Sequence, residues 1–446
     1  MEEHSVELRA RLSSVNIEVD QQPAPHRAES NAEFSLPRAD GGRQAWLLLA
    51  GAFVMEALVW GMVFSFGIFQ EHYTNDELFH GQEAQIPLIG TIASGLVYMC
   101  SPIALPMFRQ FPHRRRQVMV AGVVVVCAAF IGASFANSVA ALIATQGVLF
   151  GIGASMMYYP VFLFIDEWFV QRKGFAYGIA WASSGLSGLV FPYVLSWLLG
   201  EYGFRTTLRV LAILNLALIL PVLPVLKPRL PPSMVTRAYQ PRLAFAAKPL
   251  FLAFTIANLI EATGFFLPGI YLPSYARSIG LSNAVATSTV SLLNVGAFLG
   301  FITGGALTDR WSTKGVVLFS TAGGTLALAL MWGFSSTAVL LVVFSFCYGF
   351  FGAMFVTAWP GIIKEVVRKD PTQTAESSTC YAFFVAGRGI GSITSGPLSQ
   401  ALLRLPKLTG AFSYGYGSMY GSLIVFAIGT TVLGGLGSAS EIAGLV

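Results

Sequence analysis

Long apolar runs separated by short polar segments dominate the chain after residue 43. Residues 117–165 contain no Asp, Glu, Lys, Arg or His over 49 positions, and residues 315–363 form a second such run of the same length. A membrane-spanning helix needs about 20 apolar residues, so each run predicts two helices joined by a tight turn. Small polar residues predict these turns at residues 136–138 (Ala-Asn-Ser) and 335–337 (Ser-Ser-Thr).

The same pattern along the whole chain predicts an all-α membrane protein with twelve transmembrane helices in two six-helix pseudo-repeats. The predicted spans are residues 44–70, 83–108, 117–137, 139–165, 174–199, 206–226, 249–274, 284–308, 315–334, 337–363, 378–402 and 416–437. The halves then occupy residues 44–226 and 249–437. Residues 1–43 are polar and are expected to form a flexible cytoplasmic tail, without the apolar segment of a cleavable signal peptide. Residues 227–248 are expected to be a cytoplasmic linker and residues 438–446 a short cytoplasmic tail.

Matching residues in the two halves indicate an internal repeat. Glu56 in the first span and Glu261 in the seventh lie 205 positions apart, and each is followed by Ala. Pro192 in the fifth span and Pro397 in the eleventh have the same separation. Internal repeats of this kind are typical of secondary transporters, whose substrate site lies between the repeats near the middle of the membrane.

Composition and the placement of charge agree with this interpretation. Only 11% of the 446 residues are charged, against about 25% in a typical soluble domain, and the mean hydropathy is +0.65, which disfavours a soluble enzyme. Of the 27 Lys and Arg residues, 21 fall on the side of the predicted bundle that holds both termini, five fall on the other side, and Arg388 lies within a span. The positive-inside rule therefore predicts cytoplasmic termini in a multi-pass protein of the plasma membrane.

No motif predicts a cofactor, a metal site or an enzyme. The four cysteines lie in apolar segments without the spacing of metal ligands, and the five histidines lie in tails or loops. Glycine-rich segments lie inside apolar helices and not after a strand, as a dinucleotide-binding motif requires. The expected partners are a small-molecule substrate, protons and the lipid bilayer, with no nucleic acid. A monomer is expected to suffice, although the oligomeric state stays open.

A loop after the eighth span carries the first family resemblance. Its sequence Gly-Ala-Leu-Thr-Asp309-Arg310-Trp resembles the G-x-x-x-D-R-x-G-R-R signature of the major facilitator superfamily. The resemblance implies that this loop and the Arg172-Lys173 segment stabilise one orientation of the transporter through cytoplasmic contacts. After the second span, Arg109 stands where the signature has Asp, so the gating ion pair of that Asp is not expected here.

Further motifs resemble the monocarboxylate-transporter branch of this superfamily in its fungal form. The segment that begins at Asp40 resembles D-G-G-x-x-x-W at the entrance to the first span, and residues 168–184 resemble a branch pattern at the entrance to the fifth. Lactate carriers of the branch use a lysine in span one, where this chain has Phe64, and an Asp–Arg pair in span eight, which carries no charge here. The lactate mechanism therefore does not carry over, and a larger or different substrate is favoured.

Three ionisable residues lie near the middle of predicted spans: Glu56, Glu261 and Arg388. A charge there costs about 2.5–3.5 kcal/mol on insertion scales, so such residues normally face an interior site and serve function. The two glutamates are candidate proton-binding groups because burial favours a neutral carboxyl group, although a structural hydrogen bond is the alternative. Arg388 is a candidate anion site, and the alternative is an ion pair with either glutamate. Substrate and glutamate could also compete for this one arginine.

Three further residues are candidates for hydrogen bonds to a substrate: Tyr158 and Tyr159 in span four and Asn294 in span eight. Interfacial or packing roles explain the tyrosines at least as well, and a helix–helix hydrogen bond explains Asn294 equally well.

Together these features favour a proton-coupled secondary active transporter that moves a small organic anion or metabolite by alternating access, as symport or antiport. We expect efflux of a fungal secondary metabolite. The alternatives are uptake of a monocarboxylate or vitamin-like acid and, more remotely, a non-transporting membrane sensor on the same fold.

Overall fold

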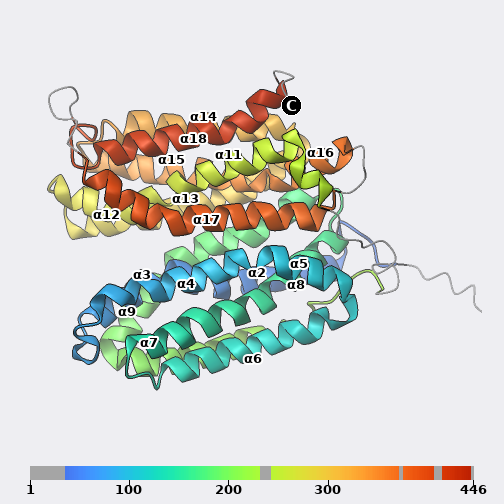
Figure 1. Ribbon diagram of the computed structural model, residues 1–446, viewed down its shortest axis with the longest axis horizontal. Coiled ribbons are helices and arrows are strands. Elements are labelled where there is room, and N and C mark those ends of the chain that lie inside the picture. Colours follow the sequence, from blue (N-terminus) through green and yellow to red (C-terminus); the bar gives the residue numbers. More distant parts are fainter. Residues whose placement is uncertain (1–35, 232–242, 371–374, 406–413, 443–446) are drawn as a thin grey trace, which may run out of the picture. The chain divides into compact units, whose positions relative to one another are not determined.

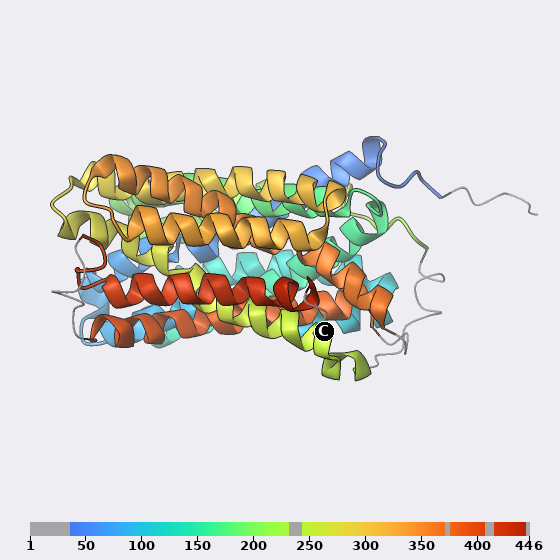
Figure 2. The ribbon, with the colours of Figure 1, turned by 90° about the horizontal axis from the view of Figure 1, so that it is seen from above.

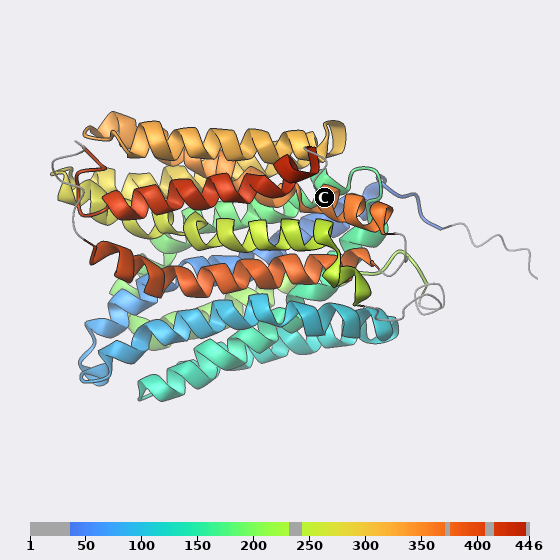
Figure 3. The same ribbon diagram turned by 45° about the horizontal axis from the view of Figure 1, so that its top comes forward.

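The computed structural model describes residues 36–231, 243–370, 375–405 and 414–442. Most of the predicted N-terminal tail, the centre of the predicted linker and the end of the predicted C-terminal tail lie outside the described residues. Residues Arg38–Val446 form one unit, and the description below is confined to it. Its described residues form helices and no strand, and these helices run side by side in all three views (Figure 1, Figure 2 and Figure 3).

The helices that precede the linker are called the N-terminal half. They are α2 (Arg43–Phe64), α3 (Phe66–Thr74), η1 (Glu77–Phe79), η2 (Glu83–Gln85), α4 (Ile86–Met99), α5 (Ser101–Gln110), η3 (Pro112–Arg114), α6 (Arg115–Ala133), α7 (Val139–Leu142), the π-helix η4 (Ile143–Leu149), α8 (Phe150–Trp168) and α9 (Lys173–Ile219).

The helices that follow the linker are called the C-terminal half. They are η5 (Ala244–Ala247), α11 (Pro249–Phe265), α12 (Leu267–Ser278), α13 (Asn283–Arg310), α14 (Thr313–Leu326), the π-helix η6 (Ala327–Trp332), α15 (Ala338–Thr357), α16 (Trp359–Lys369), α17 (Ser377–Leu403) and α18 (Gly421–Ile442).

These helices follow the twelve predicted spans. Within the described ranges, nine helical stretches are long and apolar enough to cross a membrane, or ten if α4 and α5, bent by 40°, count as one span. Helix α9 contains two of the predicted spans. They are separated by a break at Gly203, whose φ of 68° is a conformation that costs glycine little. The remaining predicted span is α17, which carries Arg388.

Side-chain caps explain the tight turns. The Ser138 hydroxyl accepts a hydrogen bond from the Ala141 backbone N–H at the start of α7, and the Thr337 hydroxyl accepts one from the Leu340 N–H at the start of α15. Each cap satisfies one of the backbone donors that a helix start leaves unpaired. Both predicted turns are therefore confirmed.

The two halves meet along α9 and α13 and along α4, α5 and α17 (Figure 1). Glycines let α9 approach α13 closely, since a Cβ atom on Gly178 would collide with the Phe301 carbonyl oxygen and one on Gly185 would lie 2.8 Å from the Phe298 nitrogen. On the other side, the Ser101 hydroxyl donates a 2.9 Å hydrogen bond to the Ala382 carbonyl oxygen of α17. These contacts surround the candidate site described next.

Candidate functional site

Helices of both halves carry the three predicted ionisable residues into the interior. Glu56 on α2 is 2% exposed, and Glu261 on α11 and Arg388 on α17 are each 5% exposed. The Arg388 Nη1 atom lies 2.8 Å from the Glu261 Oε2 atom. Of the two predicted ion-pair partners for Arg388, the structure therefore contains Glu261.

Aromatic rings hold the arginine in place beside Glu261. The guanidinium carbon of Arg388 lies 4.1 Å from the centre of the Phe265 ring and 5.6 Å from that of Phe266, a geometry that attracts a cation to the ring face. A cavity of about 10 Å³ adjoins Glu261, with Thr321 and Tyr348 in its lining. This volume is close to the minimum that holds one water molecule.

Glu56 has neutral neighbours instead. The Tyr158 hydroxyl interacts with the Glu56 carboxyl group and with Trp60. The Trp60 ring in turn packs 4.5 Å, centre to centre, from that of Tyr98. Tyr98 lies within electrostatic reach of both Glu56 and Arg388, so it connects the surroundings of Glu56 with the Arg388–Glu261 pair.

Five rings on α8, α9, α16 and α17 pack together across the two halves. We call Phe162, Tyr177, Trp181, Trp359 and Tyr381 the aromatic cluster, and all five are buried. Ring centres lie 5.6 Å apart for Phe162 and Tyr381, 5.8 Å for Trp181 and Trp359, and 6.0 Å for Trp359 and Tyr381. The cluster therefore bridges the two halves.

Two of the three candidates for hydrogen bonds to a substrate already bond to backbone carbonyl oxygens. The Tyr159 hydroxyl donates to the Val97 carbonyl oxygen within the N-terminal half. The Asn294 side-chain N–H group donates to the Gly188 carbonyl oxygen at 3.2 Å and to that of Val290 at 3.0 Å. These contacts match the helix-packing alternatives, and Tyr158 is the member of this group that lies beside an ionisable residue.

The signature loop of the C-terminal half contacts the N-terminal half directly. The Asp309 carboxylate, at the end of α13, accepts 2.8 Å hydrogen bonds from the backbone N–H groups of Gly174 and Phe175 at the start of α9. A carboxylate at a helix start satisfies free N–H donors and favours the helix dipole. Arg310, the next residue, is exposed.

A second carboxylate holds the loop that leads into α9. One Asp40 side-chain oxygen accepts 2.8 Å hydrogen bonds from the backbone N–H groups of Val170, Gln171 and Arg172. Although partial burial raises the pKa of Asp40, the three backbone donors and the Arg172 charge outweigh it and hold this pKa below its ordinary value. We call the end of the bundle that holds Asp40, this loop and Asp309 the motif end.

Ion pairs also form at the motif end. Arg109, which replaces the signature Asp, lies with its Nε atom 3.0 Å from a carboxylate oxygen of Glu376, the residue that precedes α17. The ion pair of the signature Asp is absent here, and an ion pair of the reverse charge pattern is present: the arginine stands on the loop and the carboxylate on the other half. Lys173 pairs with Asp166 at 2.6 Å.

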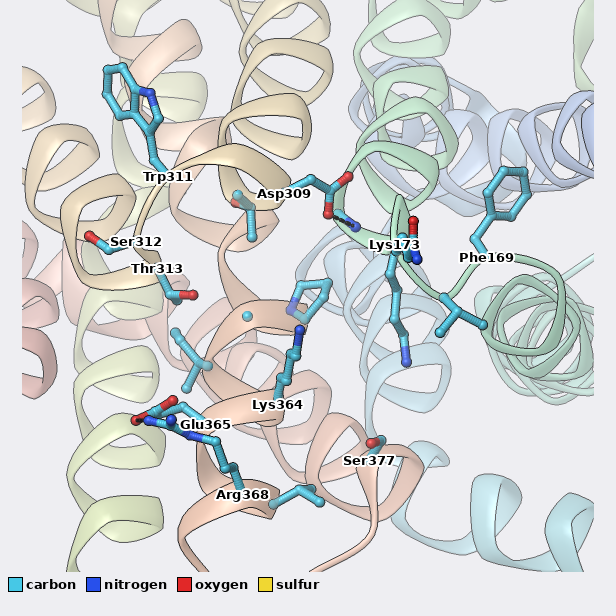
Figure 4. A pocket seen from close by; sticks show the side chains of 18 of the residues that line it. Phe169, Lys173, Asp309, Trp311, Ser312, Thr313, Lys364, Glu365, Arg368 and Ser377 are labelled. Carbon is cyan, nitrogen blue, oxygen red and sulfur yellow. Dashed lines mark hydrogen bonds and ion pairs between the residues drawn. The ribbon is translucent and has the colours of Figure 1, made fainter. Parts of the chain in front are cut away.

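A pocket of about 740 Å³ opens at the motif end (Figure 4). Lys173 borders it from the N-terminal half, and Asp309 and Lys364 border it from the C-terminal half. Its lining includes Pro360, which is adjacent to Trp359 in the chain. Within the described ranges, no group of three or more His, Cys, Asp or Glu side chains could hold a metal ion.

Several residues at the site were not predicted from the sequence. Asp40 had a usable signal, since it begins the Asp-Gly-Gly motif. Tyr98, Trp181 and Tyr381 are aromatic residues in apolar spans that contain many others, and nothing in the local sequence distinguishes them. Only the packing of the two halves brings these rings together.

Comparison with known proteins identifies the family. A sequence model described as Major Facilitator Superfamily matches residues 46–395, and a further match covers residues 254–436. The MFS-type transporter pynF of Aspergillus niger is 25% identical over 400 residues, which cover 89% of this chain and 90% of pynF. The MFS-type transporter pytF of Aspergillus terreus is 30% identical over 283 residues, which cover 63% of this chain and 95% of pytF. The aspyridones efflux protein apdF of Emericella nidulans is 25% identical over 373 residues, which cover 83% of this chain and 74% of apdF.

These relatives are fungal transporters and not enzymes, as the sequence predicts. The match to the family model covers most of the chain, and the apolar helices support a multi-pass membrane protein. The monocarboxylate branch stays a prediction. This all-α membrane transporter belongs to the Major Facilitator Superfamily.

Proposed function

We propose that the chain is a proton-coupled transporter that exports a small organic metabolite, with the substrate bound between the two halves. The observation that carries this proposal is the unequal environment of the two buried glutamates. Glu261 is paired with Arg388 at 2.8 Å, whereas Glu56 has Tyr158 as its hydrogen-bonding neighbour. Burial without a nearby cation favours the neutral form of a carboxyl group, so Glu56 is suited to bind a proton inside the membrane.

In the proposed cycle, Glu56 binds the proton and the Arg388–Glu261 pair binds the substrate, and the two binding events are coupled. Tyr98 lies within electrostatic reach of both Arg388 and Glu56, so these two groups flank the same side chain. A shift of Arg388 toward Glu56 would change the partner of each glutamate. A substrate with a negative group would compete with Glu261 for the guanidinium group. Proton binding, substrate binding and the contact between the halves are thereby linked.

The motif end supplies the contacts that would break when the halves, residues 44–226 and 249–437, rock past each other. Asp309 reaches the start of α9, and Arg109 reaches Glu376, so both contacts join the N-terminal half to the C-terminal half. Basic residues are concentrated on this side of the sequence-derived topology, which supports a cytoplasmic motif end. In this orientation the contacts hold the two halves together at the cytoplasmic side of a protein in the plasma membrane.

The efflux direction is supported by a relative and by the pocket. A fungal relative is named as an efflux protein for aspyridones. The 740 Å³ pocket lies at the motif end, where a transporter that exports its substrate must collect it. The lactate-type lysine of span one is replaced by Phe64, which removes a charge that uptake carriers of that branch use.

Everted vesicles with an acidic interior test this proposal. We expect uptake of organic acids from a panel of benzoate, 2-naphthoate and decahydro-2-naphthoate to exceed that of vesicles without the protein, and to stop when a protonophore collapses the pH gradient. Glu56→Gln, which keeps the shape of the side chain but cannot titrate, should abolish the dependence on the gradient. Tyr193→Phe, which removes an exposed hydroxyl group bonded to Ser291 and leaves the buried ionisable residues in place, is the matched control. Uptake that is indifferent to the gradient in the wild type would contradict proton coupling.

A further inference from the structure

We propose that the aromatic cluster is the binding slot and that it takes a flat, conjugated molecule with hydrogen-bond acceptors at its edge. This inference rests on the proposed function and adds the chemical class of its substrate. It is carried by unpaired donors in the slot and by the orientation of the rings.

Two buried hydrogen-bond donors in the cluster lack a bonded partner among the described residues. These are the Trp359 indole N–H group, in a residue 2% exposed, and the Tyr381 hydroxyl group, in a residue 4% exposed. The Tyr381 hydroxyl lies near that of Tyr158, but the two groups lack the geometry of a hydrogen bond. Buried polar groups are nearly always satisfied in folded proteins, so these two donors call for an acceptor that arrives with a ligand.

An unpaired acceptor lies close to the same place. The Asn258 side chain, 1% exposed, donates to the Phe384 carbonyl oxygen at 2.9 Å, while its own oxygen has no partner within the described ranges. The Phe384 ring stacks on that of Trp359, with centres 5.8 Å apart and planes at 25°. Two donors of the cluster and a nearby acceptor are therefore unpaired, and all three come from the C-terminal half.

Three rings of the cluster present nearly parallel faces. The planes of Trp181 and Tyr381 differ by 9°, those of Phe162 and Tyr381 by 21°, and those of Phe162 and Trp181 by 29°. The rings come from α8, α9 and α17, so both halves contribute a face. Stacking rewards a flat π-system that aligns with such faces, whereas a saturated ring of the same size is too thick to align and lacks the π-face.

The slot also lies at the inner end of the pocket. Ser377 in the pocket lining is one helical turn from Tyr381 on α17, and Lys173 is one turn from Tyr177 on α9. Pro360 in the lining is adjacent to Trp359. The cluster therefore lies within one helical turn of pocket-lining residues on α9 and α17 and directly beside one on α16.

Equilibrium dialysis of the purified full chain with two matched acids tests the slot. The probes are 2-naphthoate, which is flat, and decahydro-2-naphthoate, which carries the same carboxylate on a saturated ring system. We expect the flat acid to bind at least about tenfold more tightly. Tyr381→Phe and Trp359→Phe each remove one donor and keep a ring, so each should weaken 2-naphthoate binding about fivefold to tenfold, in line with the loss of one hydrogen bond. Tyr193→Phe should leave the binding unchanged.

Three results would overturn the inference: equal affinity for the two acids, no binding of 2-naphthoate, or unchanged binding in both Tyr381→Phe and Trp359→Phe. These results differ from a failure of the proposed function. If vesicle uptake is still driven by the pH gradient and still depends on Glu56 while the two acids bind equally, the flat slot is wrong and proton-coupled export stands. If binding distinguishes the acids but uptake ignores the gradient, the slot stands and proton coupling is wrong.

Discussion

Glu56 and Glu261 occupy matching positions in the two halves and yet have different surroundings. Glu261 faces Arg388, which is itself held against Phe265, so the negative charge of this carboxylate is balanced inside the protein. Glu56 is equally buried but has Tyr158 and the nearby Trp60 as its neighbours. The repeat in the sequence therefore fixes where a carboxyl group lies, while the packed helices decide whether it is paired.

Under the proposed function, this difference separates two roles that a coupled transporter needs. A paired carboxylate stabilises the fold and keeps its charge, whereas an unpaired buried carboxyl group changes charge when it binds a proton. The following substitutions break or sharpen the comparison, from the largest expected effect to the smallest.

Removal of the arginine should have the largest effect. Arg388→Gln leaves Glu261 as an uncompensated charge at 5% exposure, which typically costs about 3–5 kcal/mol in buried pairs. We expect a clearly lower thermal unfolding midpoint of the purified protein in detergent. The double variant Glu261→Gln, Arg388→Gln should recover most of the loss, because neither charge is then left alone. Wild-type stability in the single variant would show that the pair does not stabilise the fold.

Substitution of Glu56 should change the stability of the protein little and its transport activity strongly. Glu56→Gln should change the free energy of unfolding by less than about 1 kcal/mol, because no cation loses its partner, but should abolish gradient-driven uptake in vesicles. Glu261→Gln is the comparison, since it leaves Arg388 buried and unpaired and should lower the unfolding midpoint. The comparison fails if both glutamine variants destabilise the protein to the same degree.

Carboxylates at the motif end extend the comparison to groups that backbone donors stabilise. Asp309→Ala removes the acceptor of the Gly174 and Phe175 N–H groups. Hydrogen exchange at these two amides should accelerate about tenfold, as expected for ~1.4 kcal/mol of lost local stability. Asp309→Asn, which retains one acceptor oxygen, should give a smaller acceleration. Unchanged exchange in both variants would mean that the contact contributes nothing to closure.

The smallest expected effect is the loss of amide protection around Asp40 in acidic solution. The folded pKa of Asp40 lies below its ordinary value of 3.8, so its contribution is fully present above that value and is lost as pH falls through the lowered pKa. After correction for intrinsic rates, the Val170, Gln171 and Arg172 amides should keep their protection from exchange at pH 5 and lose it only in more acidic solution. Loss of this protection between pH 5 and 7 would contradict the assignment.

Sequence reasoning reached the architecture because lipid imposes a simple rule: each span must be long and apolar. It also located Glu56, Glu261 and Arg388, since charges inside spans are rare. It left open which glutamate the arginine contacts, because that choice depends on how α11 and α17 pack. Cross-half contacts such as Arg109–Glu376 were not predicted for the same reason.

The aromatic cluster shows most clearly what could not be predicted from the sequence. The chain contains 35 Phe, 15 Tyr and 8 Trp residues, so aromatic character alone selects none of them. Trp359 and Tyr381 become distinctive only through the absence of a partner for their buried donors within the described ranges, a property that requires a packed structure.

Infrared difference spectroscopy of the protein in lipid can observe the two carboxyl groups separately. A carboxyl C=O band that appears on protonation should titrate with pH in the wild type, disappear in Glu56→Gln, and persist in Tyr193→Phe and in the double variant Glu261→Gln, Arg388→Gln. A band that survives Glu56→Gln and is lost in the double variant would assign the proton to Glu261 and contradict the division of roles between the two glutamates.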